Sequence, residues 1–362
     1  MASNPLSENQ ASEAPSPAPL TSDQLLPPIE PPSAGFILQL FVVPAVIVLA
    51  VVLISLLITT VATRGDQDPE RIVAALRSSN QARWQKADEL ANMLRMEKRY
   101  PELKSNHAMA FQLAELLNAE VDAGRDDENS IKLRYFLSRV LGEFYVDDGL
   151  EVLLKTARED PERDVRRESV NALAVLAHTF HTMDPPQLLE HPQLVNTLIE
   201  LANEPDDLSR SQAAFAIGVV AFPLGADPRL TAELEVLVDD LYPDARYNAA
   251  LALARQGNLL AEDAVREMLT AEALQLSTSK EVSSALQAFK RNTILSNALD
   301  AAETLLEKNP LEEPDQLRTA LKQFVEEAPT WQLESPVPGV LIERGHEVLE
   351  NYTSRRKPAT PR

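Results

Sequence analysis

Apolar residues recur at helical spacing along most of this chain, but one stretch differs because nearly all of its residues are apolar. From Phe36 to Ala62 no residue carries a charged side chain. At about 1.5 Å per residue, a helix of this length exceeds the roughly 30 Å of hydrocarbon in a bilayer. A cleaved signal peptide would place a basic segment ahead of a shorter apolar core, and we find neither. Residues 35–63 therefore predict one transmembrane helix, with Val43–Ala62 as its strict span.

After residue 64 the apolar positions follow the three-to-four-residue spacing of amphipathic helices. The segment "DQDPERIVAALRSSN" offers Asp68 as an N-cap and Pro69 at the first helical position. Further helical segments are separated by short polar breaks such as "REDPERD", "NEPDD" and "RQGN", whose residues cap helices and form turns. No segment alternates between apolar and polar residues as a strand would. The sequence predicts an all-α fold.

One helical pattern repeats along residues 64–308. Counting from Arg246, Ala250 lies four positions on, Leu253 seven, Ala254 eight and Gly257 eleven. The same frame begins at Arg83, Arg134, Arg166 and Arg210. Its eighth position is always small: Ala91, Gly142, Ala174, Gly218 and Ala254. These offsets lie on one helix face, and small residues there allow neighbouring helices to approach to about 8 Å. Since one helix pair cannot bury its apolar face alone, we expect the pairs to stack.

Three of these segments resemble a known repeat family. The segments "DPERDVRRESVNALAVLA", "PDDLSRSQAAFAIGVVA" and "YPDARYNAALALARQGN" resemble the Asp-x-x-Val-Arg-x-x-Ala-x-x-Ala-Leu-Gly signature of HEAT repeats, which build α-solenoids. With a membrane anchor ahead of the repeats, the chain is similar to bacterial membrane-anchored HEAT-repeat proteins.

The resemblance implies roles for the charged residues of the motif. In HEAT repeats the aspartate caps the second helix of a pair, and the arginine pairs with acids of an adjacent repeat. The matching residues here are Asp164 with Arg166, Asp207 with Arg210, and Asp244 with Arg246. Arg83 and Arg134 have no aspartate at the equivalent place, so the first two units depart from the family pattern.

The ends of the chain differ from the repeats. Residues 1–34 contain eight prolines and few large apolar residues, so we expect a disordered tail. Residues 309–352 predict two helices that cap the stack, because a terminal unit must present a polar outer face. Residues 353–362 predict a basic disordered tail.

Charge and composition narrow the possible functions. The net charge is −21, which argues against nucleic acid as a partner because binding depends on neutralising phosphates. The chain has no cysteine, which excludes thiol catalysis, thiolate metal sites and disulfides. Residues 1–63 hold no Lys or Arg, whereas Arg64, Arg71 and Arg77 follow the apolar stretch. The positive-inside rule therefore predicts a single-pass membrane protein with a cytoplasmic C-terminal domain and its N-terminal tail outside.

Enzymatic motifs are scarce. No nucleophile elbow, P-loop, dinucleotide-binding fingerprint or His-Glu-x-x-His motif occurs. The nearest candidate is "HTFHTMDPPQLLEH", where His178 and His181 share a helical face and Asp184 and His191 follow. Three imidazoles and a carboxylate could bind zinc or iron. Because two prolines interrupt the segment, we favour histidines at a helix end, and we expect no catalytic residue, metal or cofactor.

Taken together, these patterns predict a membrane-anchored scaffold that binds another protein through a HEAT-like solenoid. The acidic charge favours a basic partner. The alternative is an enzyme or enzyme subunit of the HEAT-like lyase type, with a histidine-based metal site as one option.

Overall fold

The computed structural model describes residues 69–355, apart from 78–82, 97, 101, 223–224 and 311–314, and a few positions nearer the N-terminus. Those positions are Gly35, Ala45, Val46 and residues 48–55. The chain divides into two compact units, Met1–Asp66 and Gln67–Arg362. The predicted disorder of residues 1–34 and 356–362 concerns residues outside this described part.

In the first unit, residues 48–55 are helical and their side chains are exposed. Most of the predicted transmembrane helix, Phe36–Ala62, lies outside the described residues. Within the part of the chain that is described, no helix has both the length and the apolar character needed to cross a bilayer.

Every regular element described in the second unit is a helix, which confirms the all-α prediction for the described residues. The α-helices are α2 (Pro69–Leu76), α3 (Arg83–Arg95), α4 (His107–Ala123), α5 (Glu128–Gly142), α6 (Leu150–Glu159), α7 (Arg163–Thr182), α8 (Leu194–Ala202), α9 (Asp207–Val220), α10 (Pro228–Leu237), α11 (Pro243–Gln256), α12 (Glu262–Met268), α13 (Ala271–Thr278), α14 (Ser284–Lys308), α15 (Asp315–Glu327) and α16 (Gly339–Arg355). Two short 3₁₀ turns, η2 (Leu259–Ala261) and η3 (Ala328–Thr330), complete the set.

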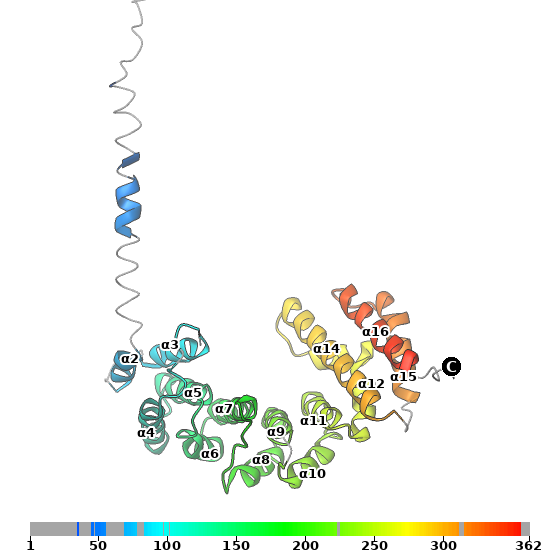
Figure 1. The fold of residues 1–362 in the computed structure, drawn as a ribbon, viewed down its shortest axis with the longest axis horizontal. Coiled ribbons are helices and arrows are strands. Elements are labelled where there is room, and N and C mark those ends of the chain that lie inside the picture. Colours follow the sequence, from blue (N-terminus) through cyan, green and yellow to red (C-terminus); the bar gives the residue numbers. More distant parts are fainter. Residues whose placement is uncertain are drawn as a thin grey trace, which may run out of the picture. The chain divides into compact units, whose positions relative to one another are not determined.

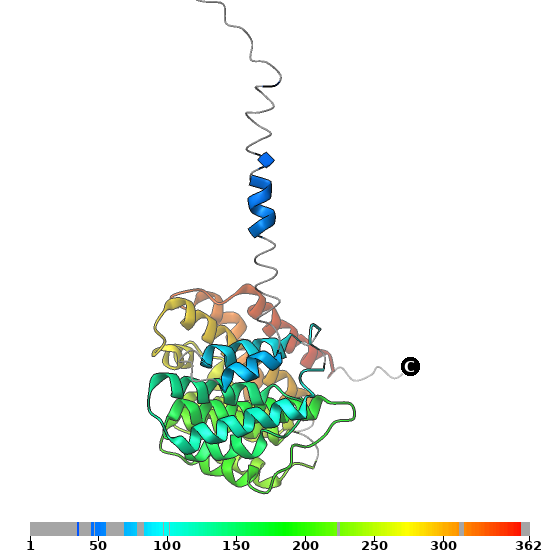
Figure 2. The same ribbon diagram turned by 90° about the vertical axis from the view of Figure 1, so that its left-hand side faces the viewer.

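The helices of this unit form two rows. In one row α3, α5, α7, α9, α11 and α14 contact one another in that order, and in the other α4, α6, α8 and α10 do the same (Figure 1). The view turned by 90° shows that helices of successive pairs run side by side (Figure 2). The first row carries all five arginines of the repeat frame, so stacking brings equivalent positions of consecutive repeats next to one another.

Helix ends follow the local sequence. Asp127 and Asp206 precede α5 and α9, and each side chain accepts a hydrogen bond from a backbone N–H in the first turn. Gly257 ends α11 with a φ of 81°, a left-handed conformation that favours glycine. These caps satisfy backbone groups that a helix end would otherwise leave unpaired.

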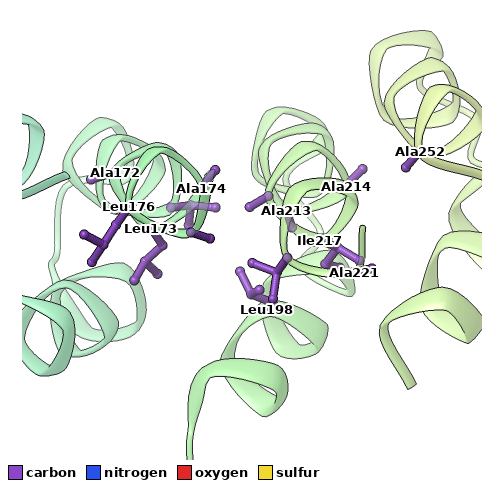
Figure 3. Close-up of a cluster of buried hydrophobic side chains, with 14 of the residues drawn as sticks. Ala172, Leu173, Ala174, Leu176, Leu198, Ala213, Ala214, Ile217, Ala221 and Ala252 are labelled. Atoms are coloured by element: carbon purple, nitrogen blue, oxygen red, sulfur yellow. The ribbon is translucent and has the colours of Figure 1, made fainter. Parts of the chain in front are cut away.

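The core lies between the rows and between consecutive helices of the first row. Figure 3 shows Ala174 and Ala213 between α7 and α9, with Leu198 of α8 below them. Two glycines mark the closest approaches. A Cβ at Gly142 would lie 2.8 Å from the Ala172 Cα, and one at Gly218 would lie 2.6 Å from the Ala252 Cβ. The small eighth position of one repeat therefore faces an alanine of the next repeat, and a larger residue there would separate the helices.

The C-terminal helices complete the stack. α14 is 25 residues long and contacts α11, α12 and α16. α15 and α16 pack on each other, and α16 extends to Arg355, three residues beyond the predicted end of the capping region at 352. Residues 353–355 of the predicted basic tail are thus the last residues of this helix.

Candidate functional site

The arginines of the repeat frame tie consecutive repeats together. Arg210 shows the full arrangement: its Nη1 donates to the backbone carbonyl of Glu204, at 3.1 Å, in the loop of its own repeat. Its Nε and Nη2 donate to the two carboxylate oxygens of Asp240 in the next loop, at 2.7 and 3.1 Å. One planar guanidinium thereby fixes two loops at once, as the fork geometry of arginine allows.

Arg166 and Arg246 occupy the same position in their repeats. Arg166 Nη1 donates to the Asp160 carbonyl at 3.0 Å, and its Nη2 lies 3.9 Å from the Glu204 carboxylate. Arg246 Nη1 donates to the Asp240 carbonyl, and its Nε donates to Glu267 at 2.9 Å. Each arginine thus contacts its own loop and an acid that follows in the chain.

Arg134, in a repeat that departs from the family pattern, makes the most buried of these contacts. Its side chain and that of Asp160 are both fully buried, and Nε donates to the carboxylate at 2.6 Å. Its Nη1 donates to the Arg125 carbonyl at 2.8 Å. Arg83 pairs with Glu120 at 3.0 Å and donates to the Leu76 carbonyl at 3.3 Å. The missing aspartates of the motif therefore do not remove the inter-helix contact.

The motif aspartates take a different role from the one the family resemblance implies. Asp164, Asp207 and Asp244 lie in the first turns of their helices and are not the N-caps. α9 is capped by Asp206, whereas the residues preceding α7 and α11 make no side-chain cap bond. The motif aspartates instead accept from nearby basic groups, as Asp207 does from Arg210 at 2.9 Å.

The acids that bind the arginines were not identified from the sequence. Three of these five acids lie six positions before the next arginine of the frame, a spacing that could have pointed to them: Asp160, Glu204 and Asp240. The other two, Glu120 and Glu267, have no such spacing. Burial opposes ionisation of Asp240, but hydrogen bonds from Arg210 and the Tyr242 N–H outweigh it and lower the pKa of its carboxyl. We call the five frame arginines, together with the acids that they bind, the arginine ladder. Because these charged groups bind one another, the arginine ladder stabilises the loops and is not suited to acid–base chemistry.

The remaining repeat positions, Gly218 and Ala254, lie on the packed face of their helices. Ala254 is fully buried on α11, and Gly218 faces Ala252 on the neighbouring helix. Neither position offers a functional group to a ligand.

Three exposed large apolar side chains lie near the start of α14. Val282, Leu286 and Phe289 are 92%, 46% and 71% exposed, and the latter two are one helical turn apart on the same face. Further along the same helix one face is buried, with Leu295 and Leu299 fully covered. In Figure 1 the N-terminal, yellow end of α14 projects beyond α11. We call these three residues the α14 patch.

The histidine segment does not assemble a metal site. His178 is exposed near the end of α7, and the His181 ring meets the edge of Phe222 at 5.4 Å between centroids. The Nδ1 atom of His191 accepts a hydrogen bond from the Gln193 N–H at 3.2 Å. Over the described residues, no group of three or more His, Asp or Glu side chains is arranged to hold a metal ion.

Similarity to known proteins is found among solved structures. Neither a protein-family model nor a curated protein sequence matches the chain. Similar solved structures include an archaeal HEAT-like repeat protein from Thermococcus onnurineus NA1, at 17% identity and a TM-score of 0.44, covering 79% of this chain and 97% of that one. They also include human deoxyhypusine hydroxylase in complex with glycerol, at 16% identity and a TM-score of 0.28, covering 81% and 98%.

Proposed function

We propose that this protein is a membrane-anchored scaffold whose helical stack binds another protein through the α14 patch. The observation that carries the proposal is the exposure of Val282, Leu286 and Phe289 at the start of a helix whose later turns bury their apolar face. Removing exposed large apolar side chains from water lowers the free energy, so such side chains favour association with a partner that covers them. A helix end that presents apolar residues one turn apart is suited to packing against a helix or groove of a partner.

The charge of the chain favours a basic partner. With 55 acidic and 34 basic residues, the chain attracts cationic surfaces and repels anionic ones, which speeds association with the former. Two lysines, Lys280 and Lys290, flank the α14 patch, but Lys290 is paired with Asp244 at 2.9 Å. The apolar contact at the α14 patch would supply affinity for the partner, and the acidic surface of the rest of the chain would select a basic partner.

The anchor rests on the sequence of residues 36–62. Their uncharged, mostly apolar sequence and the arginines that follow them support a single span with the C-terminal unit in the cytoplasm. The test is a pair of reporter fusions at the C-terminus, one active only in the cytoplasm and one active only outside it. We expect the cytoplasmic reporter to be active, and activity of the outside reporter would contradict the orientation.

Site-specific photocrosslinking in native membranes tests the scaffold role. A photoreactive residue at Leu286 should capture a discrete partner, and the substitution Phe289→Asp in the same chain should abolish capture. Val236 on α10, which is 65% exposed, is the matched control position outside the patch. Equal capture at both positions, or capture that survives Phe289→Asp, would refute binding through the patch.

The enzyme alternative has no described observation in its favour. Its decisive test is the metal content of the purified full-length chain. Stoichiometric zinc or iron that is lost when His178 and His181 are replaced by alanine would support it against the scaffold.

A further inference from the structure

A second surface feature, separate from the α14 patch, is a pocket beside the segment that follows α7. Its volume is about 690 Å³, within the range of pockets that hold small molecules. It is lined by His181 near the end of α7, residues 186–188, residues 221–222 and 225–226 after α9, and the ends of α11 and α14. The Phe222 ring, 45% exposed, and Leu188 supply its apolar lining.

The polar lining of this pocket is basic in a protein that is otherwise acidic. Three basic side chains line it, each from a different helix: His181, Arg255 and Lys308. No aspartate or glutamate is among the lining residues. Since acids outnumber bases by 55 to 34 in the chain, a pocket with three bases and no acid departs from the general surface.

Arg255 differs from the arginines of the ladder because no carboxylate of the described residues pairs with it. Its Nε donates a long bond, 3.4 Å, to the Leu251 carbonyl, and its guanidinium lies 5.8 Å from the centre of the Phe222 ring. Desolvation lowers the pKa of this guanidinium, which no acid offsets. An arginine held in this way has donors left for an anionic ligand.

Lys308 places a second cation beside this arginine. Its Nζ donates to the Arg255 carbonyl at 2.6 Å, so it satisfies the end of α11 and lies beside the arginine backbone. Helix-end compensation explains this contact of Lys308, but it leaves the guanidinium donors of Arg255 unused.

We propose that this pocket binds a small phosphate monoester with an apolar or aromatic body. The phosphate would accept from Arg255 and Lys308, with the His181 imidazole lining the same pocket. The body of the ligand would pack against Phe222 and Leu188. A dianionic head group suits two cationic side chains better than a monoanionic carboxylate does, and the planar guanidinium matches two phosphate oxygens.

Calorimetric titration of the purified full-length chain with phenyl phosphate tests this inference. Inorganic phosphate, phenol and benzoate are the comparison probes. Inorganic phosphate lacks the aryl group, phenol lacks the anionic group, and benzoate lacks the second negative charge. We expect phenyl phosphate to bind more tightly than any of the three. Undetectable binding of phenyl phosphate, or benzoate binding as tightly, would overturn the proposal.

Substitutions locate the site. We expect Arg255→Gln and Lys308→Gln each to weaken phenyl phosphate binding about tenfold or more, the loss of one charge-assisted hydrogen bond. Arg318→Gln and Lys322→Gln, at exposed positions of α15, are the matched charge controls and should leave binding unchanged. Equal weakening by the controls would show general charge attraction and refute the pocket. Because the two pocket variants act through different helices, misfolding of one still leaves the other to decide.

Discussion

The helices α9 and α11 approach most closely where Gly218 faces Ala252, and substitutions at these two positions test that approach. Gly218→Ala places a Cβ 2.6 Å from the Ala252 Cβ. Two non-bonded carbon atoms attract each other best at roughly 3.5–4.0 Å, so this distance is a steric clash. Ala252→Gly removes the opposing methyl. The double variant carries the methyl on α9 in place of α11, so the pair fits again without a clash.

The expected free energies follow from two opposing effects. Gly218→Ala gains about 1 kcal/mol of helix propensity and loses about 2 kcal/mol by overpacking, a net destabilisation of about 1 kcal/mol. Ala252→Gly loses about 1 kcal/mol of propensity and about 0.8 kcal/mol of methyl burial. Since the overpacking disappears in the double variant, it should be more stable than the sum of the single effects by about 2 kcal/mol.

Urea unfolding followed by circular dichroism gives the four free energies of this cycle. The control replaces Gly218→Ala by Gly339→Ala, because a Cβ at Gly339 meets no atom within 4 Å. That control should be additive with Ala252→Gly. Additivity to within about 0.5 kcal/mol in the Gly218 cycle itself would refute the reasoning, because it would mean that α9 and α11 do not touch at these positions.

Two further predictions concern the charged residues. Arg134→Leu should destabilise the protein by about 3–5 kcal/mol, measured by urea unfolding, because it leaves the Asp160 carboxylate buried without its guanidinium; a loss as small as that of an exposed pair would contradict the ladder as a source of stability. Burial opposes ionisation of Asp206, but hydrogen bonds from Arg167 and Ser209 prevail and lower the pKa of Asp206 to about 2. Its contribution to stability is therefore full above pH about 4 and is lost as the pH falls toward 2. Melting temperatures across this range should fall less steeply in Asp206→Asn than in the unsubstituted chain, and parallel profiles would contradict the assignment.

The arginine frame was readable from the sequence because it depends on spacing within one helix. An arginine followed eight positions later by a small residue describes one face of a helix, and such a face is set by local periodicity. The acids that pair with these arginines could not be identified in the same way. Arg134 and Asp160 lie on different elements, and only folding shows that both become fully buried. The family resemblance implied that the motif aspartates cap their helices, whereas Asp206 caps α9, where its backbone is extended and its side chain accepts from the Ser209 N–H.

The sequence by itself determined the helical fold, the repeat frame and the apolar stretch before it. Each of these is a periodicity or composition that neighbouring residues carry along the chain. The tertiary structure alone decided which side chains meet. It gathered His181, Arg255 and Lys308 from three helices around one pocket, and it left the apolar residues at the start of α14 exposed while burying those of its later turns. Such groupings depend on how helices pack, and packing joins positions far apart in the chain that no local pattern relates.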